Sequence, residues 1–160
     1  MEIKSSEIFQ RVVDNKASDL HLSVGVPPII RVNKKLTTLP GYTVFKNDDI
    51  LGLLKQILDA YQLEKYLSEK ELDFSFGLGE QARFRANAFF QKGFSAASFR
   101  AIPYKIPSLT DLNLPPIIAE FAKLPRGFVL VTGATGHGKS STLASLIDSI
   151  NKERATHIIT

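Results

Sequence analysis

Residues 133–140 constrain this chain more than any other segment, because they match the phosphate-binding pattern G-x-x-x-x-G-K-[ST] at every position. The segment before them, residues 128–132, is short, apolar and rich in β-branched side chains, which is typical of a buried parallel strand. After the loop, apolar residues recur at three- and four-residue spacing, which predicts a helix with one buried face. These residues are Leu143, Leu146, Ile147 and Ile150. A strand, a glycine-rich loop and a helix in this order predict that the chain binds a nucleoside triphosphate.

The pattern gives each part of the loop a chemical role. Glycines let the backbone turn tightly and aim successive N–H groups at a β-phosphate, and the helix that begins near Lys139 adds its positive end. Lys139 would contact the β- and γ-phosphates, and the hydroxyl of Ser140 would bind Mg²⁺. The predicted cofactors are therefore ATP and Mg²⁺. The predicted nucleotide-binding residues are Gly133, Ala134, Thr135, Gly136, His137, Gly138, Lys139, Ser140 and Ser141.

Composition limits the class of protein. The chain has 160 residues, of which 44% are hydrophobic and 22% are charged, as in an ordinary globular protein. It contains no cysteine, which excludes disulfides and a thiolate zinc site within it. No apolar run approaches membrane-spanning length and the N-terminus lacks an apolar signal core, so we expect a cytoplasmic protein. The net charge of +4 is too mild to require a nucleic-acid partner.

Residues 1–101 are predicted to form an α+β domain without a phosphate loop. Ser5 or Ser6 is expected to cap a first helix, and Asn47 or Asp48 a second. A third helix is expected at residues 60–67. Strands are expected from the alternation of apolar and polar residues over 20–24, 29–32 and 72–78, and on both sides of the turn at 91–93. Three consecutive antiparallel strands beside helices favour a PAS-like layer.

Residues 102–108 contain Pro103 and Pro107 and are predicted to be a linker between two domains. Residues 109–160 would then begin a P-loop domain, with a helix starting at prolines 115 and 116 and a second buried strand at 156–160. A doubly wound sheet needs more strands than these, and no acidic residue follows an apolar strand after the loop. We therefore expect a piece of a longer motor protein, and no ATP hydrolysis by this chain alone.

Two histidines suggest metal or acid–base chemistry at first sight. His21 alternates with Leu20 and Leu22, so it is predicted to face solvent or an interface rather than a metal. His157 lies in the strand expected at 156–160, where a structural role is favoured.

Several segments together resemble one family. Residues 17–22 (ASDLHL), 27–32 (PPIIRV), 73–76 (DFSF), 83–89 (RFRANAF) and 125–133 (PRGFVLVTG) resemble the type IV pilus retraction ATPases, the twitching-motility motors of the secretion-ATPase superfamily. The resemblance covers essentially the whole chain, in order and with matching spacings. It implies a PAS-like N-terminal domain, a RecA-like motor domain and a homo-hexameric ring.

The resemblance also implies a function and partners. The ring would use ATP hydrolysis to depolymerise pili, and it would lie in the cytoplasm, peripheral to the inner membrane, against a platform protein at the pilus base. Neither nucleic-acid binding nor direct membrane insertion is expected. The sequence departs from the family at His137, where the family usually carries a small residue. The family's acidic box, Walker-B and histidine motifs would follow Thr160, and none of them is present.

Residues 81–105 carry five basic residues and no acidic one, interleaved with aromatic residues. The basic residues are Arg83, Arg85, Lys92, Arg100 and Lys105. Three interpretations remain open: a strip that binds single-stranded nucleic acid, an inert solvated face, or a phosphate-sensing face at a subunit interface. The resemblance implies the third, with Arg85 and Arg100, and Arg83 as a lesser candidate, as catalytic residues beside Lys139.

Other functions also remain open at this point. The chain could belong to a RecA-like motor that translocates nucleic acid, or to a pilus extension or type II secretion ATPase. A non-enzymatic alternative is a regulatory or assembly fragment that binds a partner through residues 1–101.

Overall fold

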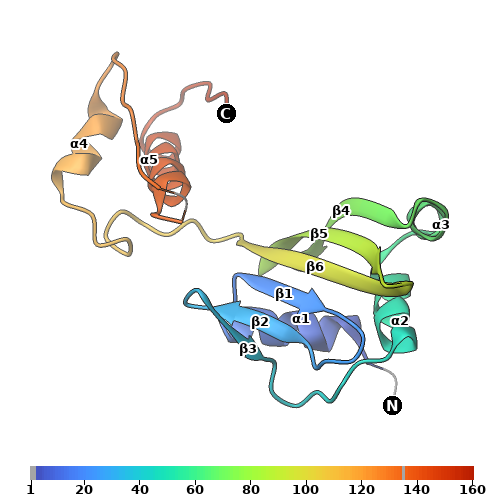
Figure 1. Cartoon of the computed structure of the whole chain (residues 1–160). Coiled ribbons are helices and arrows are strands. Elements are labelled where there is room, and N and C mark those ends of the chain that lie inside the picture. Colours follow the sequence, from blue (N-terminus) through green and yellow to red (C-terminus); the bar gives the residue numbers. More distant parts are fainter. Residues whose placement is uncertain (1–2, 135) are drawn as a thin grey trace. The chain divides into compact units, whose positions relative to one another are not determined.

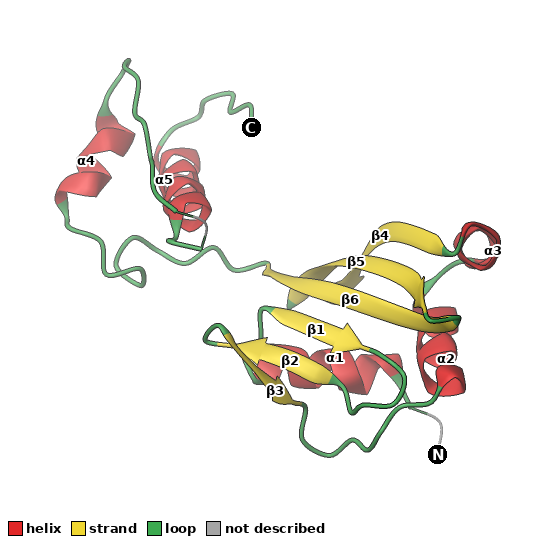
Figure 2. Ribbon diagram, in the orientation of Figure 1, coloured by secondary structure: helices red, strands yellow, loops and turns green. Residues whose placement is uncertain are grey.

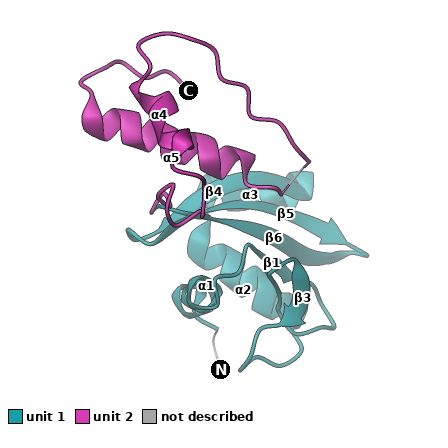
Figure 3. Ribbon diagram, turned by 90° about the vertical axis from the view of Figure 1, so that its left-hand side faces the viewer, with its two compact units in different colours: residues 1–104 teal, residues 105–160 magenta. Residues whose placement is uncertain are grey.

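A computed structural model describes residues 3–134 and 136–160 (Figure 1). The chain divides into two compact units, Met1–Tyr104 and Lys105–Thr160, which Figure 3 shows in different colours. In the part of the chain that the structure describes, no helix has the length and apolar composition needed to span a bilayer.

Unit 1 is built on one antiparallel sheet with the strand order β3-β2-β1-β6-β5-β4. Helices α1 and α2 lie on one face of this sheet (Figure 2). The elements are α1 (Ser5–Asp14), β1 (Asp19–Leu22), β2 (Ile29–Val32), β3 (Lys35–Thr38), α2 (Asn47–Ile57), α3 (Ala60–Glu69), β4 (Glu71–Leu78), β5 (Ala82–Gln91) and β6 (Phe94–Pro103). This sheet confirms the predicted α/β class with a PAS-like N-terminal layer. Strand β6 includes residues 102 and 103, which the sequence had assigned to the linker.

The core lies between the helices and the sheet, and Phe9 of α1 is at its centre. The ring of Phe9 contacts Phe76, Phe84 and Phe99, with centroid separations of 4.8, 4.9 and 4.9 Å. Alternation along β4 and β5 directs Phe74, Phe84 and their neighbours at i ± 2 to this face. The opposite face of β4 and β5 therefore carries the polar residues of these two strands.

The helix starts differ from the predicted caps. The N-cap of α1 is Lys4, and the Ser5 backbone N–H donates to Gln56 Oε1 at 2.8 Å, so neither Ser5 nor Ser6 caps this helix. Helix α2 also begins after a lysine, Lys46, whose N–H donates to Asp49 Oδ2 at 2.7 Å. The Asp49 carboxylate in the first turn thus accepts a hydrogen bond from the N-cap N–H. This is one of the two hydrogen bonds that make up a capping box. The α3 cap follows the usual pattern, with Asp59 Oδ1 accepting from the Gln62 N–H at 2.8 Å.

The described residues of unit 2 form two helices, α4 (Ile117–Lys123) and α5 (Lys139–Glu153). The strands predicted at 128–132 and 156–160 are wrong, because neither segment forms a strand in the described structure. The side chains of Phe128 and Ile159 are 87% and 85% exposed. A parallel strand takes its hydrogen bonds from neighbouring strands, and the described residues of unit 2 include no strand to supply them. His157 is exposed, so it has no structural role in a strand here.

Candidate functional site

The phosphate loop leads directly into helix α5. Gly138 is the residue before the helix, with φ +80°, and Gly136 has φ +79°. A Cβ at either position would meet no atom within 4 Å, so the backbone angle and not lack of space is what requires glycine here. The first helical hydrogen bond runs from the Thr142 N–H to the Gly138 carbonyl at 2.9 Å. The helix therefore begins inside the glycine-rich motif, as a phosphate-binding loop requires.

The loop folds around the carbonyl oxygen of Ala134. Lys139 Nζ donates to this oxygen at 2.9 Å, and the His137 N–H donates to it at 3.3 Å. Lys139 is half-buried, whereas Ser140 and His137 are exposed. The ammonium group thus lies over the loop, and the Ser140 hydroxyl is accessible at the start of the helix. This arrangement suits an anion with an associated cation.

The remaining predicted loop residues have simpler positions. Gly133 and Ala134 are exposed, and Ser141 is half-buried in the first turn of α5. Thr135 lies outside the described residues. His137 points to solvent, which agrees with a loop that works through backbone N–H groups and tolerates a side chain there.

The three arginines predicted as phosphate sensors lie on the polar face of the sheet in unit 1, and their partners differ. Arg83 Nη2 donates to Ser75 Oγ on β4 at 2.7 Å. Arg100 Nε donates to Asp19 Oδ1 on β1 at 3.2 Å. Arg85 is directly opposite Arg100 in the β5–β6 ladder, and the ion pairs found within the described residues do not include it.

Arg100 overturns one premise of the sequence interpretation. Residues 81–105 contain no acid, but Asp19 supplies a carboxylate to Arg100 from 81 residues away. The arginine strip is therefore partly neutralised. Sequence reasoning missed Asp19 because the pairing depends on the β1–β6 register, in which Asp19 faces Arg100.

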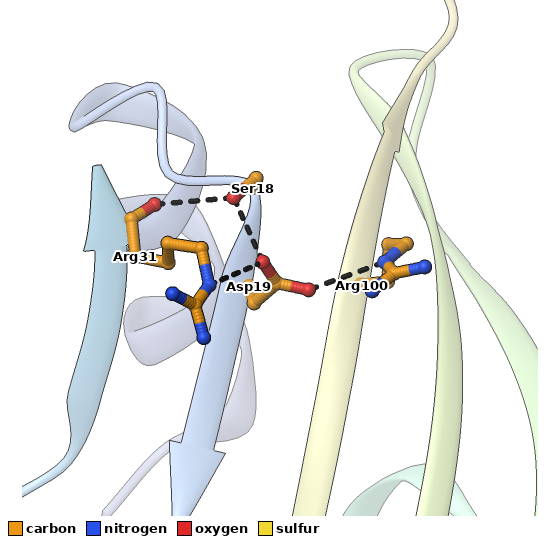
Figure 4. A network of polar contacts seen from close by, with 4 residues as sticks. All are labelled: Ser18, Asp19, Arg31 and Arg100. Atoms are coloured by element: carbon orange, nitrogen blue, oxygen red, sulfur yellow. Dashed lines mark hydrogen bonds and ion pairs between the residues drawn. The ribbon is translucent and has the colours of Figure 1, made fainter. Parts of the chain in front are cut away.

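Asp19 is the centre of a small polar network (Figure 4). Its Oδ2 accepts from Ser18 Oγ at 2.8 Å and from Arg31 Nε at 3.2 Å, and its Oδ1 accepts from Arg100 Nε. Burial raises the pKa of Asp19, but the Ser18 hydrogen bond and the charges of Arg100 and Arg31 outweigh it and hold the pKa below its ordinary value. The carboxylate is thus kept ionised at neutral pH.

A shallow cavity of about 210 Å³ lies next to this network and includes Arg85, Arg100, Asn87 and His21. His21 is only partly exposed, and its Nε2 is buried without a hydrogen-bond partner in the described part of the structure. His21 was predicted to face solvent or an interface, and it lies in a row with Ser98 and Asn87 across the sheet.

Two aromatic residues of the strip do not share the arginines' face. Phe84 and Phe99 are 0% and 1% exposed and belong to the core. These two rings cannot stack on bases while the sheet is folded, whereas Phe94 and Tyr104 of the same strip are 50% and 53% exposed.

The geometry defines a class: a P-loop nucleotide-binding unit attached to a PAS-like unit with an arginine-bearing sheet face. Comparison with known proteins agrees. Residues 106–160 match the family described as type II/IV secretion system protein. The chain is 40% identical to the type IV pilus retraction ATPase PilT of Pseudomonas aeruginosa over 144 residues, covering 90% of this chain and 42% of that protein.

Two further matches agree with this one. A twitching motility protein of Neisseria gonorrhoeae is 40% identical over 133 residues, covering 83% of this chain and 35% of that protein. The solved structure of the pilus retraction motor PilT with bound ADP is similar with a TM-score of 0.76 and 38% identity, covering 94% of this chain and 44% of that one. The chain is a PilT-like member of the secretion-ATPase superfamily. It spans less than half the length of the curated relatives that it matches.

Proposed function

We propose that this chain supplies the ATP-binding portion of a hexameric motor ATPase that drives type IV pilus retraction. The observation that carries the proposal is a phosphate loop that enters helix α5 at Lys139, in a chain that matches pilus retraction ATPases over most of its length. The solved relative that contains ADP supports nucleotide binding at this loop. The PAS-like domain would extend to the end of β6 at Pro103, residues 104–108 would form the linker, and residues 109–160 the start of the RecA-like domain.

The residues of the loop fit a nucleotide with its metal ion. Lys139 already lies over the loop through its bond to the Ala134 carbonyl, and an incoming phosphate would replace that neutral acceptor with a charged one. Ser140 is exposed and would hold Mg²⁺, which screens phosphate charge when it is bound. Lys139 and Ser140 therefore have separable roles, one in phosphate binding and the other in metal binding.

The arginines of unit 1 would sense the γ-phosphate. Arg85 and Arg100 are exposed on the same face of the sheet, and a guanidinium binds phosphate oxygens through two parallel N–H groups. In the proposed ring of six subunits this face would meet the nucleotide bound to a motor domain. Arg83 is the lesser candidate, because it already donates to Ser75.

The proposed setting is cytoplasmic, peripheral to the inner membrane, against a platform protein at the pilus base. The similarity to proteins named for pilus retraction and twitching motility supports the pulling function. The cytoplasmic setting and the platform partner are what membership of that family implies. In a bacterium that depends on this protein, Lys139→Ala should leave pili on the cell surface and abolish twitching. Cells that still twitch with this variant would contradict the proposal.

A binding assay tests the nucleotide site directly. We expect the chain to bind ADP with Mg²⁺ in a calorimetric titration, and Lys139→Ala to weaken this binding by about tenfold or more, since a charge-assisted contact is lost. Lys152→Ala is the matched control, because Lys152 is an exposed lysine on the same helix that pairs with Asp148. Equal binding by all three proteins would refute the assignment of the loop.

A further inference from the structure

Charged side chains form one continuous row across the polar face of the sheet. The ladders place Arg31, Asp19, Arg100 and Arg85 opposite one another on β2, β1, β6 and β5. The row therefore holds three guanidinium groups and one carboxylate, which pairs with Arg31 and Arg100. Like charges directly opposite each other in a sheet are destabilising, so the Arg100–Arg85 position favours the arrival of a further anion.

The contacts of Asp19 leave most of each arginine unused. Arg31 and Arg100 each donate to Asp19 through Nε, at 3.2 Å in both cases. A guanidinium has five N–H groups, and no hydrogen bond of the terminal nitrogens of Arg100 is found among the residues that the structure describes. In Figure 4 one of these terminal nitrogens lies on the side of Arg100 away from Asp19.

Asp19 itself is held in place. Its side chain is 12% exposed, whereas that of Arg100 is 73% exposed. The hydroxyl of Ser18 donates to its Oδ2, and the Ser18 hydroxyl also lies 3.4 Å from the Arg31 carbonyl oxygen. The Asp19 carboxylate is buried and accepts several hydrogen bonds. It can therefore fix the Nε end of the Arg100 side chain while the terminal nitrogens of that side chain stay accessible.

We propose that Asp19 is a positioning residue, which holds Arg100 by its Nε and presents the terminal N–H groups of Arg100 to a phosphate-type anion beside Arg85. This inference rests on the proposed function, in which Arg85 and Arg100 sense phosphate. Asp19 lowers the ordering cost of the anion contact, because an arginine that is already fixed loses fewer rotamers when it binds. The three predicted phosphate sensors then differ. Arg100 is held by a carboxylate and Arg83 by a hydroxyl, whereas Arg85 is exposed and belongs to none of the ion pairs of the described residues.

The order of Arg100 can be measured in the whole chain by NMR. The ¹⁵N–¹H heteronuclear NOE of the Arg100 Nε–H reports whether the base of this side chain is rigid. We expect a value near that of the backbone in the parent, a large loss in Asp19→Asn, and recovery in Asp19→Glu. Glu71→Gln is the control, because Glu71 is an exposed carboxylate on the same sheet face whose hydrogen bond comes from Asn87. An Arg100 signal that is equally rigid in Asp19→Asn would overturn the proposal.

A titration with an anion distinguishes a positioning role of Asp19 from a purely electrostatic effect of its charge. Inorganic pyrophosphate is titrated into proteins that also carry Lys139→Ala, which silences the phosphate loop, and the Nε–H shifts of Arg85 and Arg100 are followed. By charge alone, Asp19→Asn should tighten binding, since a negative charge is removed. Positioning predicts the opposite, a rise in the apparent Kd of about threefold or more, because Arg100 must be ordered on binding. Tighter or unchanged binding would overturn the inference.

A second variant, Ser18→Ala, tests the same inference if Asp19→Asn fails to fold. Ser18→Ala removes the hydroxyl that orients Asp19 and leaves both ion pairs possible, so it should lower the Arg100 NOE and raise the Kd in the same direction as Asp19→Asn, by less. If Ser18→Ala and Asp19→Asn both fold and change neither quantity, the inference fails. The NMR and pyrophosphate results do not depend on Lys139. Either these results or the ADP-binding test can therefore fail without affecting the interpretation of the other.

Discussion

Phe9 provides the sharpest test of how unit 1 is held together. It is 1% exposed and is the residue through which α1 contacts three strands at once, since Phe76, Phe84 and Phe99 belong to β4, β5 and β6. Removing the ring should therefore leave a cavity at the centre of the core. The surrounding rings are fixed by their own strands, so they cannot collapse far into the space.

The expected loss follows from these contacts. Replacing a buried Phe by Ala costs roughly 3–5 kcal/mol, and a favourable aromatic pair adds about 0.5–1.5 kcal/mol beyond area burial. With three ring neighbours within 5 Å, Phe9→Ala should fall at the upper end, roughly 4–5 kcal/mol. Phe9→Leu keeps most of the apolar area and should lose about 1–2 kcal/mol. The larger loss approaches the whole stability of a marginal domain.

Urea unfolding followed by far-ultraviolet circular dichroism measures both losses. Phe94→Ala is the control, because Phe94 lies at the start of β6 with half of its surface exposed, and its removal should cost less than about 1 kcal/mol. The order of midpoints should be parent and Phe94→Ala, then Phe9→Leu, then Phe9→Ala. A Phe9→Ala protein within about 1.5 kcal/mol of the parent would refute the central role of this ring.

Three further predictions follow from the site and the linker. Ser140→Ala should lower the Mg²⁺-dependent part of ADP affinity, whereas Ser140→Thr should keep it because the hydroxyl is retained; equal losses in titrations with and without Mg²⁺ would argue against a metal ligand. The Ser18 hydrogen bond and the arginine charges outweigh burial and lower the pKa of Asp19 in the folded protein. Its ion pairs should therefore stabilise the fold at pH values above the unfolded-state pKa of about 3.9. This stabilisation should be lost as the pH falls through the lower pKa of the folded state. The difference in urea midpoint between the parent and Asp19→Asn should thus be constant near neutral pH and shrink in acid, and a difference that grows on acidification would contradict this. The amides of Lys105 and Ile106, which follow the end of β6 at Pro103, should exchange with solvent much faster than those inside β6, and equal protection would count against a linker there.

The sheet of unit 1 could be predicted because its signal is local. Strict alternation over residues 72–78 and the turn at Lys92 and Gly93 define β4, β5 and β6, and both turn residues have positive φ in the structure, at 53° and 85°. Strand β3 was missed because Lys35–Thr38 is exposed at every position and so lacks an alternating burial pattern. Its partner β2 defines it, through a register that no local pattern contains.

The predictions that failed depend on parts of the structure distant in sequence. Residues 128–132 have the composition of a buried strand, but a strand needs neighbours to pair with, and its composition does not provide them. Ser5 has a good capping side chain, yet its backbone N–H is taken by Gln56, 51 residues away. The pairing of Asp19 with Arg100 is the same kind of case, because only the β1–β6 register brings them together.

The register that builds the core also builds the arginine face. Phe84 and Phe99 are buried on one side of β5 and β6, and side chains alternate along a strand, so Arg85 and Arg100 must lie on the other side. A slip of one residue between these strands would turn the phenylalanines toward solvent and the arginines into the core. The free energy of aromatic burial therefore fixes the opposition of Arg85 and Arg100. Asp19 makes that opposition tolerable, because it neutralises one of the two charges while leaving the terminal nitrogens of Arg100 available for an anion.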